Sequence, residues 1–119
     1  MIVGIGQDLI ETQRVLDALK RERFRTKYFT SKEIEMAVGN EMRLVGNFAV
    51  KEAVSKVFGT GFSQFMPKDI EVLRESNGKP YVILYGNALE LFRSLEMTQI
   101  YVTITNTKEY TSAVAVGEK

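Results

Sequence analysis

The sequence predicts one α+β domain spanning residues 1–119, in which a small antiparallel sheet packs on a long central helix. Three observations lead to this fold class. The 119-residue chain is 45% hydrophobic and 26% charged, which suits one globular core of modest size. A single long helical pattern covers residues 41–58. Strand-like runs follow it as hairpin neighbours, an order typical of α+β proteins.

The residue types that the chain lacks exclude several kinds of enzyme. It has no cysteine and no histidine, so it has no thiol nucleophile, no imidazole base and no zinc site of the Cys/His type. Oxygen ligands, a hard cation, Lys, Arg and Tyr remain for catalysis. The net charge of +1 gives no general attraction for nucleic acid.

The sequence also predicts where the protein is found. It contains no apolar run of the length that a membrane-spanning helix needs. Its first residues, Met1 to Gly4, enter a strand-like run without the pattern of a signal peptide. We therefore expect a soluble, cytoplasmic protein without a membrane partner.

The first element is a strand-like run over residues 2–9, interrupted by Gly4 and Gly6. Glycine inside a strand indicates a bulge or the close approach of another backbone. Asp8 stands at the end of this run, among apolar residues. It is either the N-cap of the next helix, where Asp is common, or part of a functional site.

The next helix is expected from Glu11 to about Arg23, because Val15, Leu16 and Leu19 recur at helical spacing. A basic run overlaps it: residues 11 to 27 include Arg14, Lys20, Arg21, Arg23, Arg25 and Lys27. With three acidic residues against these six basic ones, the segment carries +3, whereas the whole chain carries +1. Such a run is usually a solvated face, and otherwise a surface for an acidic partner.

Two further helices are expected before residue 60. Thr30 and Glu33 form a capping-box pattern that starts a short helix ending near Val38. After the break at Gly39-Asn40, the long helix covers residues 41–58. It ends at Gly59-Thr60-Gly61, because glycine readily takes the left-handed conformation of a helix C-cap.

Two charges lie within the apolar face of the long helix. At about 100° per residue, its apolar arc consists of Val45, Phe48, Ala49, Ala53 and Val57. Glu52 and Lys56 fall near the middle of this arc. The expected solvated face lies opposite and consists of Asn47, Lys51 and Ser55.

Burial of Glu52 and Lys56 requires partners from outside the helix. As a pair one turn apart they gain only about 0.2 to 0.5 kcal/mol, whereas uncompensated burial of an ion costs several kcal/mol. A cation for Glu52 and an anion for Lys56 are therefore expected, and a metal ion bound to a phosphate supplies both. The alternative is a purely structural ion pair.

The rest of the chain alternates strand and helix patterns. Asn77-Gly78 between two strand-like runs is the strongest short hairpin signal. Asn87 is the expected cap of the last helix. The elements expected are a loop at 62–68, a half-buried strand at 69–74, a turn at 76–80, a strand at 81–85, a helix at 87–95, and strands at 99–105 and 111–116.

Three stretches together resemble one family. They are Gly4 to Ile10 with Arg14 six residues after Asp8, then Phe48 to Gly61, then Asn77 to Pro80. In this order and spacing they resemble the bacterial holo-acyl-carrier-protein synthases of the 4'-phosphopantetheinyl transferase superfamily. The closing segment from Val102 to Tyr110 is also similar, so the resemblance covers the whole chain.

The resemblance implies the fold of that superfamily and its reaction in fatty acid biosynthesis. The phosphopantetheine arm of coenzyme A passes to a serine of apo acyl carrier protein, and adenosine 3',5'-bisphosphate is released. Asp8 and Glu52 would hold Mg²⁺, and Lys56 would bind a phosphate. These three would be the catalytic residues. The family also implies a homotrimer with sites between subunits.

The resemblance further assigns binding residues. Those expected at coenzyme A are Lys51, Ser55, Lys56, Gly59, Thr60, Gly61, Gly78, Lys79, Pro80 and Thr105. Those expected at the carrier protein are Arg14, Arg21, Arg23 and Phe24.

Three positions depart from the family. Tyr101 and Asn106 stand where histidine is frequent, and Asn47 where arginine is frequent. Phosphate contacts of those side chains would then be either absent or remade through Tyr101, Thr103 or Thr105. An alternative is a non-catalytic module of the same fold that binds coenzyme A or another nucleotide. Nucleic-acid binding by the basic run is disfavoured because acidic residues interrupt it.

Overall fold

The computed structural model describes all residues, 1–119. None of its helices is both long and apolar enough to cross a membrane. Its elements along the chain are β1 (Ile2–Glu11), α1 (Thr12–Ala18), α2 (Glu22–Tyr28), α3 (Ser31–Met36), α4 (Met42–Phe58), the 3-10 helix η1 (Pro67–Asp69), β2 (Ile70–Arg74), β3 (Pro80–Leu84), α5 (Gly86–Ser94), β4 (Gln99–Asn106) and β5 (Tyr110–Glu118).

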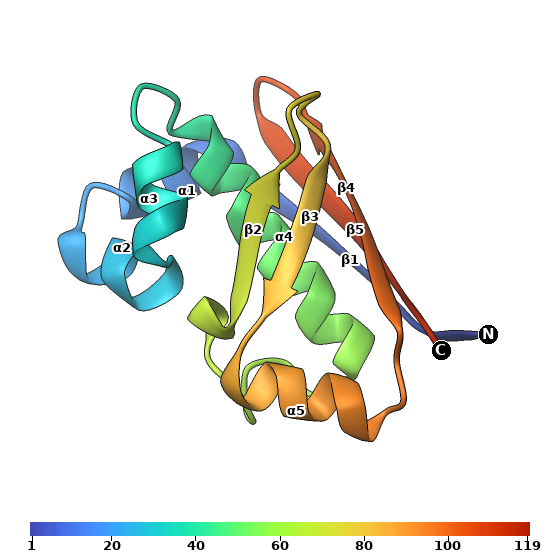
Figure 1. Cartoon of the computed structure of the whole chain (residues 1–119). Coiled ribbons are helices and arrows are strands. Elements are labelled where there is room, and N and C mark those ends of the chain that lie inside the picture. The colour runs from blue at the N-terminus through green and yellow to red at the C-terminus, as the bar shows by residue number, and fades with distance from the viewer.

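Two antiparallel sheets pack on the long helix α4. One sheet has the strand order β1-β5-β4, and the other is the hairpin β2-β3. Figure 1 shows α4 in the angle between the hairpin and the three-stranded sheet, with α1 to α3 gathered at one end. The predicted α+β class, with a small antiparallel sheet on a long central helix, is confirmed.

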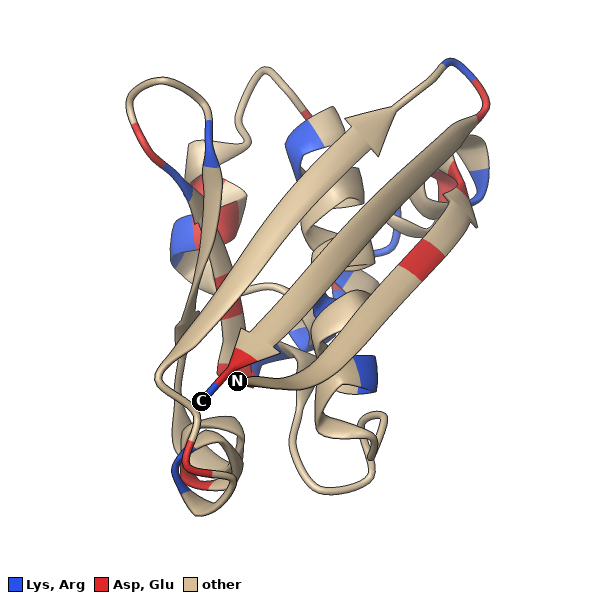
Figure 2. Ribbon diagram, turned by 90° about the vertical axis from the view of Figure 1, so that its right-hand side faces the viewer, with Lys and Arg blue, Asp and Glu red and all other residues tan.

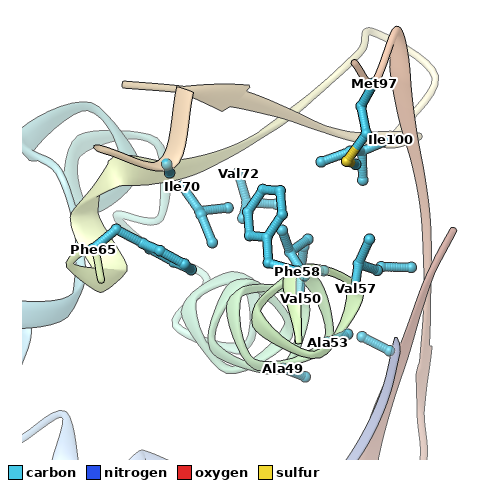
Figure 3. Packing of buried hydrophobic residues seen from close by; sticks show 14 residues of the cluster. Ala49, Val50, Ala53, Val57, Phe58, Phe65, Ile70, Val72, Met97 and Ile100 are labelled. Atoms are coloured by element: carbon cyan, nitrogen blue, oxygen red, sulfur yellow. The ribbon is translucent and has the colours of Figure 1, made fainter. Parts of the chain in front are cut away.

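Helix α4 belongs to two hydrophobic clusters. In the larger cluster, Val50 and Val57 of α4 pack toward Val72 of the hairpin and Ile100 of β4, whereas Ala53 lies on the side of the helix that faces β1 (Figure 3). The smaller cluster joins the N-terminal part of α4 to the helices before it and consists of Val15, Leu19, Phe29, Ala37, Leu44 and Val45. Because both clusters use it, 12 of the 17 residues of α4 are buried.

The prediction of which face of α4 is solvated is wrong. Asn47, Lys51 and Ser55 are buried, whereas the Lys56 side chain is 53% exposed and Glu52 is half-buried. A helical wheel assumes one apolar face and one wet face, but α4 has protein on several sides. Its polar side chains toward the hairpin are therefore enclosed, and its charges toward β1 reach solvent.

The helix expected from Glu11 to Arg23 is two helices, α1 and α2. The apolar spacing that begins at Val15 ends at Leu19, because the following positions of that face are polar. The chain must turn before Phe24 and the aromatic residues after it can reach the smaller cluster. The division into two helices thus depends on tertiary packing against the smaller cluster and not on the local helical pattern.

Most local signals are confirmed, two expectations are wrong, and one of the two alternatives for Asp8 is excluded. Thr30 and Glu33 form the capping box of α3, and Gly59 and Gly78 have φ of 77° and 91° at the end of α4 and in the hairpin turn. Asp8 does not cap α1, whose N-cap position is Glu11. Asn87 does not cap α5, which begins one residue earlier. Strand β2 is buried on both faces and not half-buried, because α4 and the start of α3 cover it.

Glycines in β1 let the strand cross α4 in backbone contact. A Cβ on Gly4 would lie 2.5 Å from the carbonyl oxygen of Val57, and one on Gly6 would overlap the carbonyl of Ala53. A register shift in the pairing with β5 falls between Ile2 and Gly4. The close approach expected at these glycines is confirmed, and it brings the end of β1 against the middle of α4.

Candidate active site

The crossing of β1 and α4 brings three charged side chains together. Lys56 donates a hydrogen bond of 2.7 Å to the carbonyl oxygen of Gln7, and its ammonium lies 3.3 Å from Oδ1 of Asp8. Ser112 of β5 donates to the carbonyl oxygen of Asp8 at 2.9 Å and fixes the strand there. Glu52 lies one helical turn before Lys56 and lines the same cavity as Asp8.

Negative charge exceeds positive charge at this crossing. Oδ2 of Asp8 is buried and has no hydrogen-bond partner. Burial raises the pKa of Glu52, and the charge of Asp8 raises it further, while Lys56 lowers it in part. Two carboxylates thus share one largely exposed ammonium. A hard divalent cation fits this set, because carboxylate oxygens are its usual protein ligands.

The two carboxylates line a cavity of about 600 Å³ between β1, α1, α2 and α4. Phe24 and Phe48 form an apolar part of its lining, and Arg14 and Arg21 also line it. Neither arginine is in a salt bridge with a carboxylate. The structure therefore joins the expected metal ligands to three of the four residues expected at the carrier protein; Arg23 is exposed outside the cavity.

The residues expected at coenzyme A lie on separate surfaces of one chain. Gly59 to Gly61 follow Lys56 at the C-terminal end of α4, whereas the turn with Gly78 to Pro80 lies at the opposite end of the molecule (Figure 1). Thr105 of β4 is exposed at the level of Leu9. Since side chains alternate along a strand, it faces away from α4, unlike Asp8.

Lys51 and Ser55 are buried and do not line the cavity of the carboxylates. The Lys51 ammonium is fully buried and donates to Oε1 of Glu33 at 2.8 Å, to the carbonyl oxygen of Pro67 at 3.0 Å and to that of Ile70. All three of its protons are used, so none remains for a phosphate. Ser55 is buried and donates to the carbonyl oxygen of Glu52. Their expected role at coenzyme A stays a prediction, and both side chains already have partners within the chain.

Sequence reasoning missed several residues of the cavity, among them Phe48 and Tyr110. Phe48 was expected only as part of the apolar arc, yet it lines the cavity beside Glu52. Its position one turn before Glu52 is the signal that places both on one side of α4. Tyr110 lines the cavity from the start of β5. No local pattern marks it, because its place depends on the pairing of Tyr110 with Glu11.

Comparisons with known proteins identify the family of the chain. The family described as the 4'-phosphopantetheinyl transferase superfamily matches residues 4–115. The chain is 51% identical to a holo-[acyl-carrier-protein] synthase of Lachnoclostridium phytofermentans over 99% of the chain and 97% of that relative. It is 46% identical to a synthase of the same name from Alkaliphilus metalliredigens, over 98% of the chain and 99% of that protein.

A solved structure extends the similarity to three dimensions. It is a holo-(acyl-carrier-protein) synthase from Bacillus anthracis in complex with CoA (3',5'-ADP), 34% identical, with a TM-score of 0.84. The alignment covers 100% of this chain and 98% of that one. The similarity therefore extends over the whole chain, including the crossing of β1 and α4. The chain belongs to the 4'-phosphopantetheinyl transferase superfamily.

Proposed function

We propose that the chain is a holo-[acyl-carrier-protein] synthase, which transfers 4'-phosphopantetheine from coenzyme A to a serine of apo acyl carrier protein. The observation that carries the proposal is the cluster of Asp8, Glu52 and Lys56, whose charges are incompletely paired inside a cavity. The relatives at 51% and 46% identity are named for this activity.

We propose that Asp8 and Glu52 hold Mg²⁺. The partnerless Oδ2 of Asp8 and the raised pKa of Glu52 support it, because both indicate carboxylate charge that the chain leaves uncompensated. When bound, the cation polarises the phosphate and stabilises charge on the departing bisphosphate.

The chain's own residues have separate roles in the transfer. Lys56 is held by the carbonyl of Gln7 and presents a partly exposed ammonium, which suits it to meet a phosphate as a point charge. The serine oxygen forms a bond to phosphorus while the bond from phosphorus to the bisphosphate oxygen breaks. The serine proton must leave as this bond forms, and Glu52 can accept it only through an oxygen that does not hold the cation.

We propose that the acyl carrier protein docks over the same cavity. Arg14 and Arg21 offer two positive charges without acidic partners, and Phe24 and Phe48 offer an apolar contact beside them. Exposed Arg23 extends this surface along α2. An acidic partner with an apolar anchor fits it, and its serine would arrive next to Glu52.

We also propose assembly into a homotrimer with sites between subunits. Figure 2 looks onto the three-stranded sheet, where charged residues are few. Its outward rows are Ile5, Val116 and Tyr101, then Gln7, Val114 and Thr103, then Leu9, Ser112 and Thr105. Ile5 and Leu9 are 64% and 65% exposed, so burial against second copies would remove apolar surface from water. Assembly could also bring Thr105 of one copy to the carboxylates of another.

Light scattering on the purified chain tests the assembly. A mass of three chains is the expected result. Leu9→Lys should lower it, since a charge would enter the interface. A monomer with full transfer activity would contradict sites between subunits.

The activity itself is tested by mass spectrometry. Apo acyl carrier protein incubated with the chain, coenzyme A and Mg²⁺ should gain the mass of one phosphopantetheine, and chelation of Mg²⁺ should prevent the gain. Binding of coenzyme A without any mass gain would instead favour the non-catalytic module.

A further inference from the structure

A chain of hydrogen bonds joins the start of α1 to the hairpin of β4 and β5, and it runs through Thr12, Thr111 and Asn106. The hydroxyl oxygens of Thr12 and Thr111 lie 2.9 Å apart, and Thr111 donates to Oδ1 of Asn106 at 3.1 Å. A threonine hydroxyl has a single proton to donate. Because Thr111 gives its proton to Asn106, the hydrogen bond between the two threonines is donated by Thr12.

Both threonines of this chain are enclosed by protein. Thr111 is fully buried and Thr12 is 4% exposed. A buried hydroxyl without a partner is costly, so each threonine requires the other at hydrogen-bond distance. The pair therefore fixes the separation between the first residue of α1 and the start of β5.

Helix α1 depends on such contacts because it has little to stabilise its own start. It has seven residues, its N-cap Glu11 makes no side-chain hydrogen bond, and its first turn contains no acidic residue. Helices this short are marginal in water. The backbone N–H of Thr12 donates instead to the carbonyl oxygen of Glu109, in the turn between β4 and β5, at 2.9 Å. The start of α1 is thus anchored to that hairpin twice, by the backbone and by the threonines.

Residues of the cavity lie next to both threonines. On α1, Arg14 follows Thr12 by two residues, and on β5, Tyr110 directly precedes Thr111. Arg14 and Tyr110 both line the cavity of the carboxylates, whereas neither threonine does. Arg14 is exposed and has no salt bridge, so the place of its charge follows the place of α1.

We propose that Thr12 and Thr111 are positioning residues for the binding of the carrier protein. Their hydrogen bond holds α1, with Arg14, at a fixed place relative to Tyr110, so an acidic partner meets a preformed surface. A preformed surface binds more tightly because less freedom is lost on association. The effect falls on carrier affinity and not on the chemical step, since neither threonine reaches the cavity. This inference rests on the proposed function, in which the acidic partner is acyl carrier protein.

A purely structural role for the threonines predicts a different result. Their loss would then lower the stability of the domain and leave the KM for carrier protein unchanged. Thr30 offers a matched control, because its hydroxyl donates to Glu71 at 2.6 Å and accepts from the N–H of Glu33 at 3.2 Å. Thr30→Val therefore also removes two hydroxyl hydrogen bonds, at a place that does not line the cavity.

Transfer kinetics, measured well below the unfolding midpoint of each variant, test the proposal. Thr111→Val keeps the shape of the side chain and removes its hydroxyl. It should raise the KM for carrier protein about threefold to tenfold, which is what the freedom of one side chain costs on binding. The kcat and the KM for coenzyme A should stay at their wild-type values. Thr111→Ser keeps the hydroxyl and should restore most of the carrier KM, and Thr30→Val should leave all three constants unchanged.

Hydrogen exchange separates this inference from the proposed function. In Thr111→Val, the exchange rate of the Thr12 amide should rise by a larger factor than the rates in the middle of α4, which report unfolding of the whole domain. Equal factors at both places, or an unchanged carrier KM in Thr111→Val, would overturn the proposal. If Thr111→Val does not fold, Thr12→Val removes the donor of the same hydrogen bond and replaces it in both measurements.

A wild type that transfers nothing would contradict the proposed function and leave the inference open to its own test. Calorimetry of carrier binding then takes the place of the KM. Weaker binding of the carrier by Thr111→Val, together with faster exchange at Thr12, would still support the positioning role. Carrier binding equal to that of the wild type would overturn it.

Discussion

Lys51 and Lys56 stand five residues apart on α4 and have opposite surroundings. Lys51 is fully buried, and a carboxylate and two carbonyl oxygens use all its protons. Lys56 is 53% exposed and contacts one carboxylate and one carbonyl oxygen. The difference indicates that a functional charge is recognised by incomplete pairing and not by burial.

The two regions differ in the same way beyond the lysines. Around Lys51, Glu33 also accepts from Asn47, and Glu71 accepts from Thr30 at 2.6 Å and from Tyr85 at 2.9 Å. These bonds join α3, α4, β2 and the segment after β3, and their carboxylate oxygens are all paired. Around Lys56, one oxygen of Asp8 has no partner. In the first region the amide oxygen of Asn47 also has no partner, but it is neutral, and every charged group there is paired. The first region therefore holds the fold, and the second is left to bind a ligand.

Removal of a carboxylate should have the largest effect on activity. Asp8→Ala or Glu52→Ala should lower the transfer rate by more than about a thousandfold, because several kcal/mol of charge stabilisation would be lost. Circular dichroism should show an unchanged fold, since neither side chain completes a network. A rate equal to that of the wild type in either variant would remove both residues from the metal site.

The matched lysine variants test the comparison on stability. Lys51→Met should lower the free energy of unfolding by about 3 to 5 kcal/mol, because it leaves Glu33 buried and unpaired. The double variant Glu33→Leu with Lys51→Met should recover part of the lost free energy of unfolding, because no unpaired charge stays buried. Lys56→Met should change stability by less than about 1 kcal/mol, because the lysine side chain is 53% exposed, while it weakens coenzyme A binding.

Urea unfolding and calorimetry measure these two properties separately. Equal losses of stability in the two lysine variants would show that the regions do not differ. Unchanged affinity for coenzyme A in Lys56→Met would make Lys56 structural.

Charge reversal around the cavity should have a smaller effect, confined to the carrier protein. Arg14→Glu with Arg21→Glu should raise the KM for carrier protein by about tenfold or more, or about 1.4 kcal/mol, and leave coenzyme A affinity nearly unchanged. The wild type should also lose carrier affinity as salt rises, because exposed charges are screened. Lys68→Glu with Arg93→Glu is the control of equal net charge. If both double variants behave alike, the basic run is only a solvated face.

Local signals were enough to predict the ends of several elements. The Thr30–Glu33 box, the Asn77-Gly78 turn and the glycine after α4 each act within a few residues, so the sequence contains all that is needed. Tertiary partners were not predictable in this way. Lys51 appeared solvated because Glu33 and the carbonyl of Ile70 are 18 and 19 residues away along the chain.

The candidate site was predicted in part from helical spacing and in part from family resemblance. Spacing singled out Glu52 and Lys56, although it placed Lys56 within an apolar arc where the structure has it largely exposed. Asp8 was ambiguous from the sequence, because its neighbours on α4 are set by the glycine crossing of β1. Tyr110 lines the cavity because of its strand pairing, and no local sequence pattern predicts that position.

The central claim is that the carboxylates of the site bind a ligand and lower the stability of the ligand-free protein. Thermal unfolding of Glu52→Gln across pH tests it most directly. A pKa raised in the folded state means that Glu52 favours folding when protonated and that this contribution is lost as pH rises through the raised pKa. Without ligand, the wild type should therefore lose stability relative to Glu52→Gln above the ordinary range of glutamate. With Mg²⁺ and coenzyme A, the wild type should gain more than the variant. A variant that is less stable than the wild type at neutral pH without ligand would contradict the account.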